Sequence, residues 1–242
     1  MKLIIDIGNT NIKLAVFDKK NILKKYIYKS VQEIDLSPIL SRFYKIKYIL
    51  FCGQNKSLNK HLNNIINDKS VKIFYWDNIS KFMIDIEYDK IDSLGYDRIG
   101  GSIGALFTFP NFKNHLIIDI GTCITYDIVS NKIYKGGQIS PGINLRMKSL
   151  SGVNSKLPNL KFQEPYKFLG KSTFESIQSG VFFGVYDEII SRILLYNNKF
   201  KNLNTVITGG DSVFFKKRIK NVNFDNDILM KGLNLLLEQN VK

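Results

Sequence analysis

Residues 3–8 read Leu-Ile-Ile-Asp-Ile-Gly, and residues 116–121 repeat the same six letters near the middle of the 242-residue chain. Each copy is an apolar run ending in Asp-x-Gly, which is typical of a buried strand that leads into a tight turn. A short polar turn and a second apolar run follow each copy, at residues 12–17 and 124–129. Because the Asp and the Gly are repeated along with the apolar residues, the pattern indicates an internal duplication. The sequence therefore predicts two strand–turn–strand hairpins in two similar halves.

The remaining pattern alternates between strand and helix signals. In the first half we expect a strand at 22–28, a helix at 31–44, a strand at 48–52, a helix at 57–66 and a strand at 71–75. The small-residue segment 100–105 is predicted to be helical. In the second half we expect a long loop shaped by Gly136, Gly137, Pro141 and Gly142, a helix at 173–196, a strand at 205–208 and a helix at 227–239. This rhythm predicts an α/β fold of two domains, 1–112 and 113–242.

Composition excludes several classes of protein. With 44% hydrophobic and 23% charged residues, the chain has the composition of a globular protein. No apolar run reaches the roughly 18–20 residues of a membrane span, and the N-terminus has no signal-peptide pattern, so we expect a cytoplasmic protein with no membrane contact. The net charge of +14 comes from lysines spread along the whole chain, so we expect no specific nucleic-acid partner. Cys52 and Cys123 have no partners at metal-ligand spacing and are predicted to be buried or half-buried thiols.

The turn that begins at Asp6 carries the strongest chemical signal. A carboxylate stands where a buried strand ends, and Gly8 and Thr10 follow it with backbone N–H groups and a hydroxyl. Such a turn can hold phosphate, and its carboxylate can hold Mg²⁺ through the ion's water shell. A plain hairpin that satisfies its own backbone is the alternative for one copy, and the second copy at Asp119 weakens that alternative.

Residues 95–98, Gly-Tyr-Asp-Arg, stand just before the small-residue helix. Asp97 can take a proton from a substrate hydroxyl, and Arg98 can pair with a carboxylate or phosphate. An Asp–Arg pair that caps the helix is the structural alternative, and the sequence does not decide between them.

Gly209 and Gly210 follow the strand at 205–208 and leave room for a flat ligand such as adenine, although an ordinary strand-to-helix turn has the same pattern. The chain lacks the Gly-x-x-x-x-Gly-Lys-Ser/Thr loop and has no Gly-x-Gly-x-x-Gly fingerprint after a strand, which excludes P-loop and Rossmann nucleotide sites.

Together these motifs resemble the superfamily of acetate and sugar kinases, heat-shock proteins and actin, and in detail the type III pantothenate kinases. The matching stretches follow in family order across nearly the whole chain: 6–13, 95–98, 119–122, 136–142, 157–158, 170–173, and 178–180 with Gly184. The resemblance implies two tandem ribonuclease H-like (actin-like ATPase) domains with a nucleotide cleft between them. It also implies ATP-dependent phosphorylation of pantothenate, the first step of coenzyme A synthesis.

The resemblance also assigns roles to residues. The ATP-binding residues would be Asp6, Ile7, Gly8, Asn9, Thr10, Asn11, Ile12, Lys13 and Thr122, with Mg²⁺ held by Asp6 through water. The pantothenate-binding residues would be Tyr88, Gly95, Tyr96, Asp97, Arg98 and Thr173, with Asp97 as the general base. Asp119 would bind a monovalent cation, K⁺ or NH₄⁺. The family is dimeric, so a homodimer is expected, with the substrate pocket completed at the subunit interface.

Three positions depart from the family pattern. Tyr96 stands where a small residue is frequent, Cys123 where Ala is common, and Ile91 where Pro is frequent. None of them removes a reacting group. Two other functions stay open at this point: another kinase of the actin-like fold that acts on a sugar or carboxylate, and a non-catalytic accessory or regulatory relative. The three placed carboxylates Asp6, Asp97 and Asp119 favour an enzyme.

Overall fold

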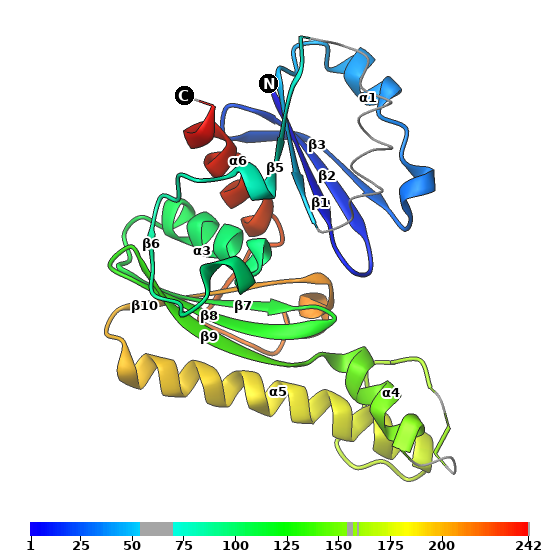
Figure 1. Cartoon of the computed structure of the whole chain (residues 1–242). Coiled ribbons are helices and arrows are strands. Elements are labelled where there is room, and N and C mark those ends of the chain that lie inside the picture. Colours follow the sequence, from blue (N-terminus) through cyan, green and yellow to red (C-terminus); the bar gives the residue numbers. More distant parts are fainter. Residues whose placement is uncertain (54–69, 154–156, 159, 242) are drawn as a thin grey trace. The chain divides into compact units, whose positions relative to one another are not determined.

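The computed structural model describes residues 1–53, 70–153, 157–158 and 160–241 (Figure 1). It contains two compact units. The first unit comprises residues 1–85, 90–107 and 228–242, and the second comprises residues 86–89 and 108–227. The predicted division at residue 112 stays a prediction, and the two units interleave in sequence around it.

A mixed sheet forms the centre of the first unit. In the described part of the chain its order is β3-β2-β1-β4-β5. Its strands are β1 (Lys2–Ile7), β2 (Ile12–Asp18), β3 (Asn21–Tyr28), β4 (Tyr48–Cys52) and β5 (Lys72–Tyr75). The first repeat lies on β1, which pairs antiparallel with β2 and parallel with β4. Leu3, Ile4 and Ile5 are fully buried, because β1 has a paired strand on each edge and both of its faces are covered.

Helices complete the first unit. Among the described residues these are α1 (Ser37–Arg42), α3 (Tyr96–Thr108) and α6 (Ile228–Asn240), with 3₁₀ turns η1 (Val31–Glu33), η2 (Trp76–Asn78) and η3 (Ile91–Ser93). Helix α6 contacts β1 (Figure 1). It also packs so closely on α3 that a Cβ on Gly232 would overlap the carbonyl of Gly100. The small residues predicted to favour close helix packing do so here.

The second unit has its own mixed sheet, ordered β11-β10-β7-β8-β9-β6 among the described residues. Its strands are β6 (Asp85–Ile86), β7 (Asn114–Ile120), β8 (Cys123–Ser130), β9 (Ile133–Pro141), β10 (Leu203–Thr208) and β11 (Asn223–Phe224). The second repeat lies on β7, which pairs antiparallel with β8 and parallel with β10. The two repeats therefore occupy equivalent places in two sheets.

Helices α4 (Ile143–Val153) and α5 (Thr173–Lys199) and the turn η4 (Gly210–Phe214) complete the second unit. Figure 1 shows α5 running along the sheet, with α4 next to its N-terminal end. Phe182, Val185 and Ile189 of α5 are fully buried and pack into a core with the apolar residues of β7 and β8. The hydroxyl of Ser172 accepts a hydrogen bond from the Glu175 N–H at 3.2 Å and caps α5 at its start.

Most predicted elements are confirmed, and two are wrong. Residues 31–44 do not form one helix: η1 and α1 are separate, because Pro38 stands at the start of α1 and favours a new helix beginning there. Residues 136–142 are not a loop, because 133–141 form β9, which pairs with β8. The helix predicted at 57–66 lies outside the described residues. Within the described residues, no helix is long and apolar enough to cross a membrane.

Candidate functional site

The first hairpin turns at residues 8–11. Ile7 pairs with Ile12, and the Gly8 N–H donates to the Asn11 carbonyl at 3.2 Å. Gly8, Asn9 and Thr10 are exposed, whereas Ile12 is buried. The predicted phosphate-binding turn is therefore a tight, solvent-facing loop between two buried strands.

Asp6 stands one residue before the end of β1 and is only 5% exposed. Lys13 faces it across the β1–β2 pair, and Cys52 is its partner on β4. Burial raises the pKa of the Asp6 carboxyl above its ordinary value. The Tyr96 hydrogen bond and the Lys13 charge oppose that rise, while the Asp97 charge adds to it. Burial is the largest of these influences, and the Asp97 charge is the smallest.

Tyr96 brings α3 to this carboxylate. Its hydroxyl donates to Asp6 Oδ1 at 2.8 Å and lies 3.2 Å from the Ile7 carbonyl oxygen. Its ring lies against Trp76, with centroids 5.9 Å apart. Burial and the neighbouring Asp6 charge raise the pKa of the Tyr96 phenol far above its ordinary range. The phenol therefore remains a hydrogen-bond donor.

Asp97 is exposed in the first turn of α3, where its Oδ1 accepts a hydrogen bond from the Arg98 N–H at 2.9 Å. A Cβ on Gly95 would overlap this carboxylate, so only glycine leaves room for the observed rotamer. Arg98 is buried. Asp97 therefore caps the helix through the backbone N–H of Arg98, as the structural alternative expects. Its carboxylate is nevertheless exposed and open to a substrate.

The second hairpin has a shorter turn. Ile120 pairs with Ile124, and the Gly121 N–H donates to the Cys123 carbonyl at 3.0 Å. Asp119 is half-buried and faces Thr125 across the β7–β8 pair. Thr122 and Cys123 are exposed, so the prediction that both cysteines are at least half-buried is wrong for Cys123. Cys123 is the first residue of β8, where the strand leaves the turn, and its partner on β9 is Pro141.

Gly209 packs directly on the second repeat. It has φ of +96°, and a Cβ there would overlap Asp119 and the backbone of Ile120. Glycine alone adopts this conformation without strain and permits this approach. Beside it, Asp211 and Phe214 of η4 line a cavity of about 350 Å³ together with Asn144 and Lys148 of α4. The predicted adenine element thus adjoins a cavity of the same unit.

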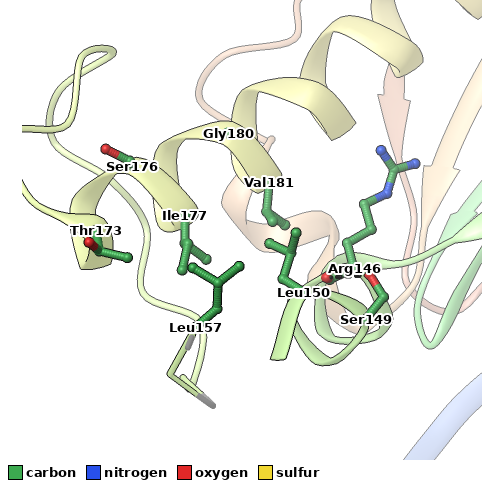
Figure 2. A pocket seen from close by; sticks show the side chains of 9 residues that line it. All are labelled: Arg146, Ser149, Leu150, Leu157, Thr173, Ser176, Ile177, Gly180 and Val181. Atoms are coloured by element: carbon green, nitrogen blue, oxygen red, sulfur yellow. Dashed lines mark hydrogen bonds between the residues drawn. The ribbon is translucent and has the colours of Figure 1, made fainter. Parts of the chain in front are cut away.

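Thr173 lies at one end of a larger cavity, of about 640 Å³, between α4 and the start of α5. Figure 2 shows Leu150 and Leu157 pointing toward Ile177 and Val181, with Arg146 at the other end. The Arg146 guanidinium donates to Glu188 and to the Pro141 carbonyl. A lining of aliphatic side chains with hydroxyls and one cation suits a small, partly apolar anion.

Glu188 holds this arginine in a hydrogen-bonded group. It also accepts from the Tyr126 hydroxyl at 2.8 Å and the Ser140 hydroxyl at 2.6 Å. Burial acts to raise the pKa of Glu188, but these hydrogen bonds outweigh it and hold the pKa below its ordinary value. Sequence analysis missed both Arg146 and Glu188. Their chain positions carry no motif, and only the packing of α4 against α5 brings them together.

Tyr88 lies in the second unit, 37% exposed, with its ring 6.2 Å from that of Tyr134. The predicted site residues thus fall into two groups. The first unit holds residues 6–13 and 95–98, and the second holds Tyr88, Asp119, Thr122 and Thr173. Among the described residues, no group of three or more His, Cys, Asp or Glu side chains is placed to hold a metal ion.

Comparison with solved structures places the fold. A candidate N-acetylmannosamine kinase from Listeria monocytogenes matches with a TM-score of 0.59 at 11% identity, covering 100% of this chain and 99% of that one. A Baf family protein from Campylobacter jejuni, described as a candidate transcriptional activator, matches with a TM-score of 0.60 at 25% identity, covering 99% and 98%. The predicted fold of the actin-like ATPases and sugar kinases is confirmed.

Comparison of sequences identifies the family. A family model described as type III pantothenate kinase matches residues 2–194. A type III pantothenate kinase from Flavobacterium psychrophilum is 39% identical over 241 residues, which cover 98% of this chain and 99% of that relative. The predicted family is thereby confirmed: the chain belongs to the type III pantothenate kinases.

Proposed function

We propose that this protein transfers the γ-phosphoryl group of ATP to the primary hydroxyl of pantothenate, giving 4'-phosphopantothenate for coenzyme A synthesis. Family membership supports the reaction. The observation that carries it in the structure is a hydrogen bond that links two carboxylates of the first unit: the Tyr96 hydroxyl donates to Asp6, and Tyr96 precedes Asp97 in the chain. Asp6 is buried near the end of a strand that leads into a phosphate-type turn, and Asp97 is exposed.

The nucleotide is assigned to both repeats. In the first unit, exposed Asn9 and Thr10 offer their backbone N–H groups and the Thr10 hydroxyl to phosphate, and Lys13 adds a positive charge opposite Asp6. In the second unit, exposed Thr122 is assigned to ATP, and the cavity beside Gly210 is assigned to the adenosine. Phosphoryl transfer depends mainly on such positioning and charge neutralisation.

The acceptor is assigned to Asp97 and its surroundings. Asp97 is the general base that accepts the proton of the pantothenate hydroxyl, and its exposure leaves it open to substrate. Gly95, Tyr96 and Arg98 complete that turn. In the second unit, the aliphatic cavity with Thr173 and Arg146 has the chemistry of pantothenate, which joins two methyl groups to a carboxylate. Tyr88 is assigned to the same substrate.

Two ions are assigned to single carboxylates. Mg²⁺ would be held by Asp6 through its water shell and would neutralise phosphate charge when bound. A buried carboxylate beside hydroxyl and backbone groups fits this hard cation. A monovalent cation, K⁺ or NH₄⁺, is assigned to Asp119, which is half-buried under Gly209.

A homodimer is part of the proposal, and the family resemblance is what implies it. Apolar side chains are exposed in two separate places, at Phe168 and Leu169 before α5 and at Leu194 and Leu195 near its C-terminal end. The cytoplasmic location and the lack of a specific nucleic-acid partner stay predictions.

An ADP-release assay with a panel of acceptor alcohols tests the reaction. We expect ATP- and pantothenate-dependent ADP release that K⁺ or NH₄⁺ stimulates, with the product identified as the phosphate monoester. Phosphorylation of a sugar without phosphorylation of pantothenate would instead identify another kinase of this fold. Nucleotide binding without any turnover would identify a regulatory relative.

A further inference from the structure

The proposed function does not explain why the Tyr96 hydroxyl forms a hydrogen bond with Asp6. The residue lies between two assigned groups: it precedes Asp97 in the chain, and its side chain reaches Asp6 on β1. As one of four residues in the pantothenate-binding turn, it was expected to face the acceptor. Its hydroxyl instead donates to the carboxylate assigned to Mg²⁺.

The hydroxyl serves this carboxylate specifically. At 2.8 Å it makes a charge-assisted hydrogen bond to Asp6 Oδ1, which is shorter than its 3.2 Å approach to the Ile7 carbonyl. Packing alone would be satisfied by phenylalanine. Because Asp6 is only 5% exposed, few water molecules can take the place of this donor.

Aromatic side chains pack against the ring of Tyr96. Trp76 lies 5.9 Å from it, and Phe82 lies 5.9 Å from Trp76 in turn. These aromatic contacts within the first unit restrict the ring, so the phenol oxygen has a defined direction. Because packing restrains the ring, the phenol orients the Asp6 carboxylate through this hydrogen bond.

We propose that Tyr96 is a positioning residue: its hydroxyl fixes the Asp6 carboxylate for the magnesium–nucleotide complex and ties that carboxylate to the turn that carries Asp97. Donors to carboxylates that hold metal ions typically contribute 10–100-fold in metal affinity or activity. This inference rests on the proposed function, because it assigns Tyr96 to the nucleotide side of the same reaction.

Tyr96→Phe tests the role, since it removes one oxygen atom and keeps the ring against Trp76. We expect kcat/KM for the magnesium–ATP complex to fall about 10-fold or more, while KM for pantothenate changes less than about 2-fold. Calorimetric titration with magnesium–ADP should show binding weakened by a similar factor. This readout does not depend on turnover.

Tyr126→Phe is the matched control. It also removes a tyrosine hydroxyl that donates to a carboxylate at 2.8 Å, but the carboxylate is that of Glu188 in the second unit. We expect a nearly unchanged magnesium–ADP affinity for this variant, and the two variants are compared on that affinity. Trp76 is the only tryptophan in the chain, so its fluorescence reports whether the aromatic contacts of Tyr96→Phe are intact.

Three outcomes overturn the inference. Wild-type nucleotide binding in Tyr96→Phe would remove the positioning role. A loss confined to KM for pantothenate would return Tyr96 to the acceptor. An equal loss in Tyr126→Phe would make the effect one of general stability. If the wild-type protein binds magnesium–ADP but does not phosphorylate pantothenate, the proposed function fails, and the titration alone still decides the role of Tyr96.

Discussion

The two copies of Leu-Ile-Ile-Asp-Ile-Gly adopt the same strand position in their sheets but differ in everything that surrounds their carboxylates. The first turn has four residues between paired isoleucines, and the second has three. Asp6 is buried, faces Lys13 and accepts from Tyr96, whereas Asp119 is half-buried, faces Thr125 and lies under Gly209. A duplicated strand thus repeats the placement of an acid, while the neighbouring residues give each acid a different charge environment.

Substitution of Asp97, the proposed general base, should lower activity more than any other change. Asp97→Asn keeps the shape of the side chain and removes its ability to accept a proton, so we expect kcat to fall about 10²–10⁴-fold. Magnesium–ADP affinity should stay nearly intact, because the carboxylate is exposed and assigned to the acceptor. Steady-state kinetics and calorimetric titration check the two parts. Near-normal turnover would end the role of Asp97 as base.

Equivalent substitutions in the two repeats should separate their roles. Asp6→Asn should lower kcat/KM for the magnesium–ATP complex about 10–100-fold at any K⁺ concentration. Asp119→Asn should abolish the stimulation by K⁺ and leave a residual activity independent of that ion. Kinetics measured over a matrix of Mg²⁺ and K⁺ concentrations distinguish the variants. If both variants lost the K⁺ response equally, the proposed division of labour would be wrong.

Glycines at the two repeats should differ in their cost to stability. Gly209→Ala places a methyl group onto Asp119 and Ile120 at a positive φ, so we expect destabilisation of about 1–3 kcal/mol or more. Gly8→Ala brings its Cβ only to 3.1 Å from the Asn11 carbonyl and should cost less. Thermal unfolding of both variants measures the difference. A smaller shift in Tm for Gly209→Ala than for Gly8→Ala would contradict this ranking.

Acid should affect the second repeat's unit through Glu188. Its pKa is lowered in the folded protein, so its stabilisation is present above the ordinary glutamate pKa and is lost as pH falls through the lower folded value. Glu188→Gln should therefore lower Tm near neutral pH by a small amount, and the difference should shrink below about pH 4. Thermal unfolding from pH 7 to pH 3 tests this. A difference that grows on acidification would reverse the sign and refute the assignment.

The sequence predicted the fold well because its signals are local or repeated. Apolar runs ending in Asp-x-Gly predicted both hairpins, and the apolar spacing of 173–196 predicted α5, which extends to Lys199. Residues 133–141 were misread because glycines and a proline suggest a loop, whereas pairing with β8 makes them a strand. Likewise, no local pattern predicts that Tyr96 reaches Asp6 or that Arg146 meets Glu188. Such contacts depend on elements far apart in the chain.

Helix α6 affects the order in which the two units can fold during translation. Helix α6 packs on α3 through Gly232 and Gly100, and its Glu238 pairs with Lys2 of β1 at 2.9 Å. The ribosome therefore completes the first sheet, and then every residue of the second unit, before it supplies the helix that covers the first strand. During translation, the surface of β1 and α3 that α6 covers stays exposed until α6 has been synthesised. The second unit, whose core residues are all made by then, has the chance to fold first.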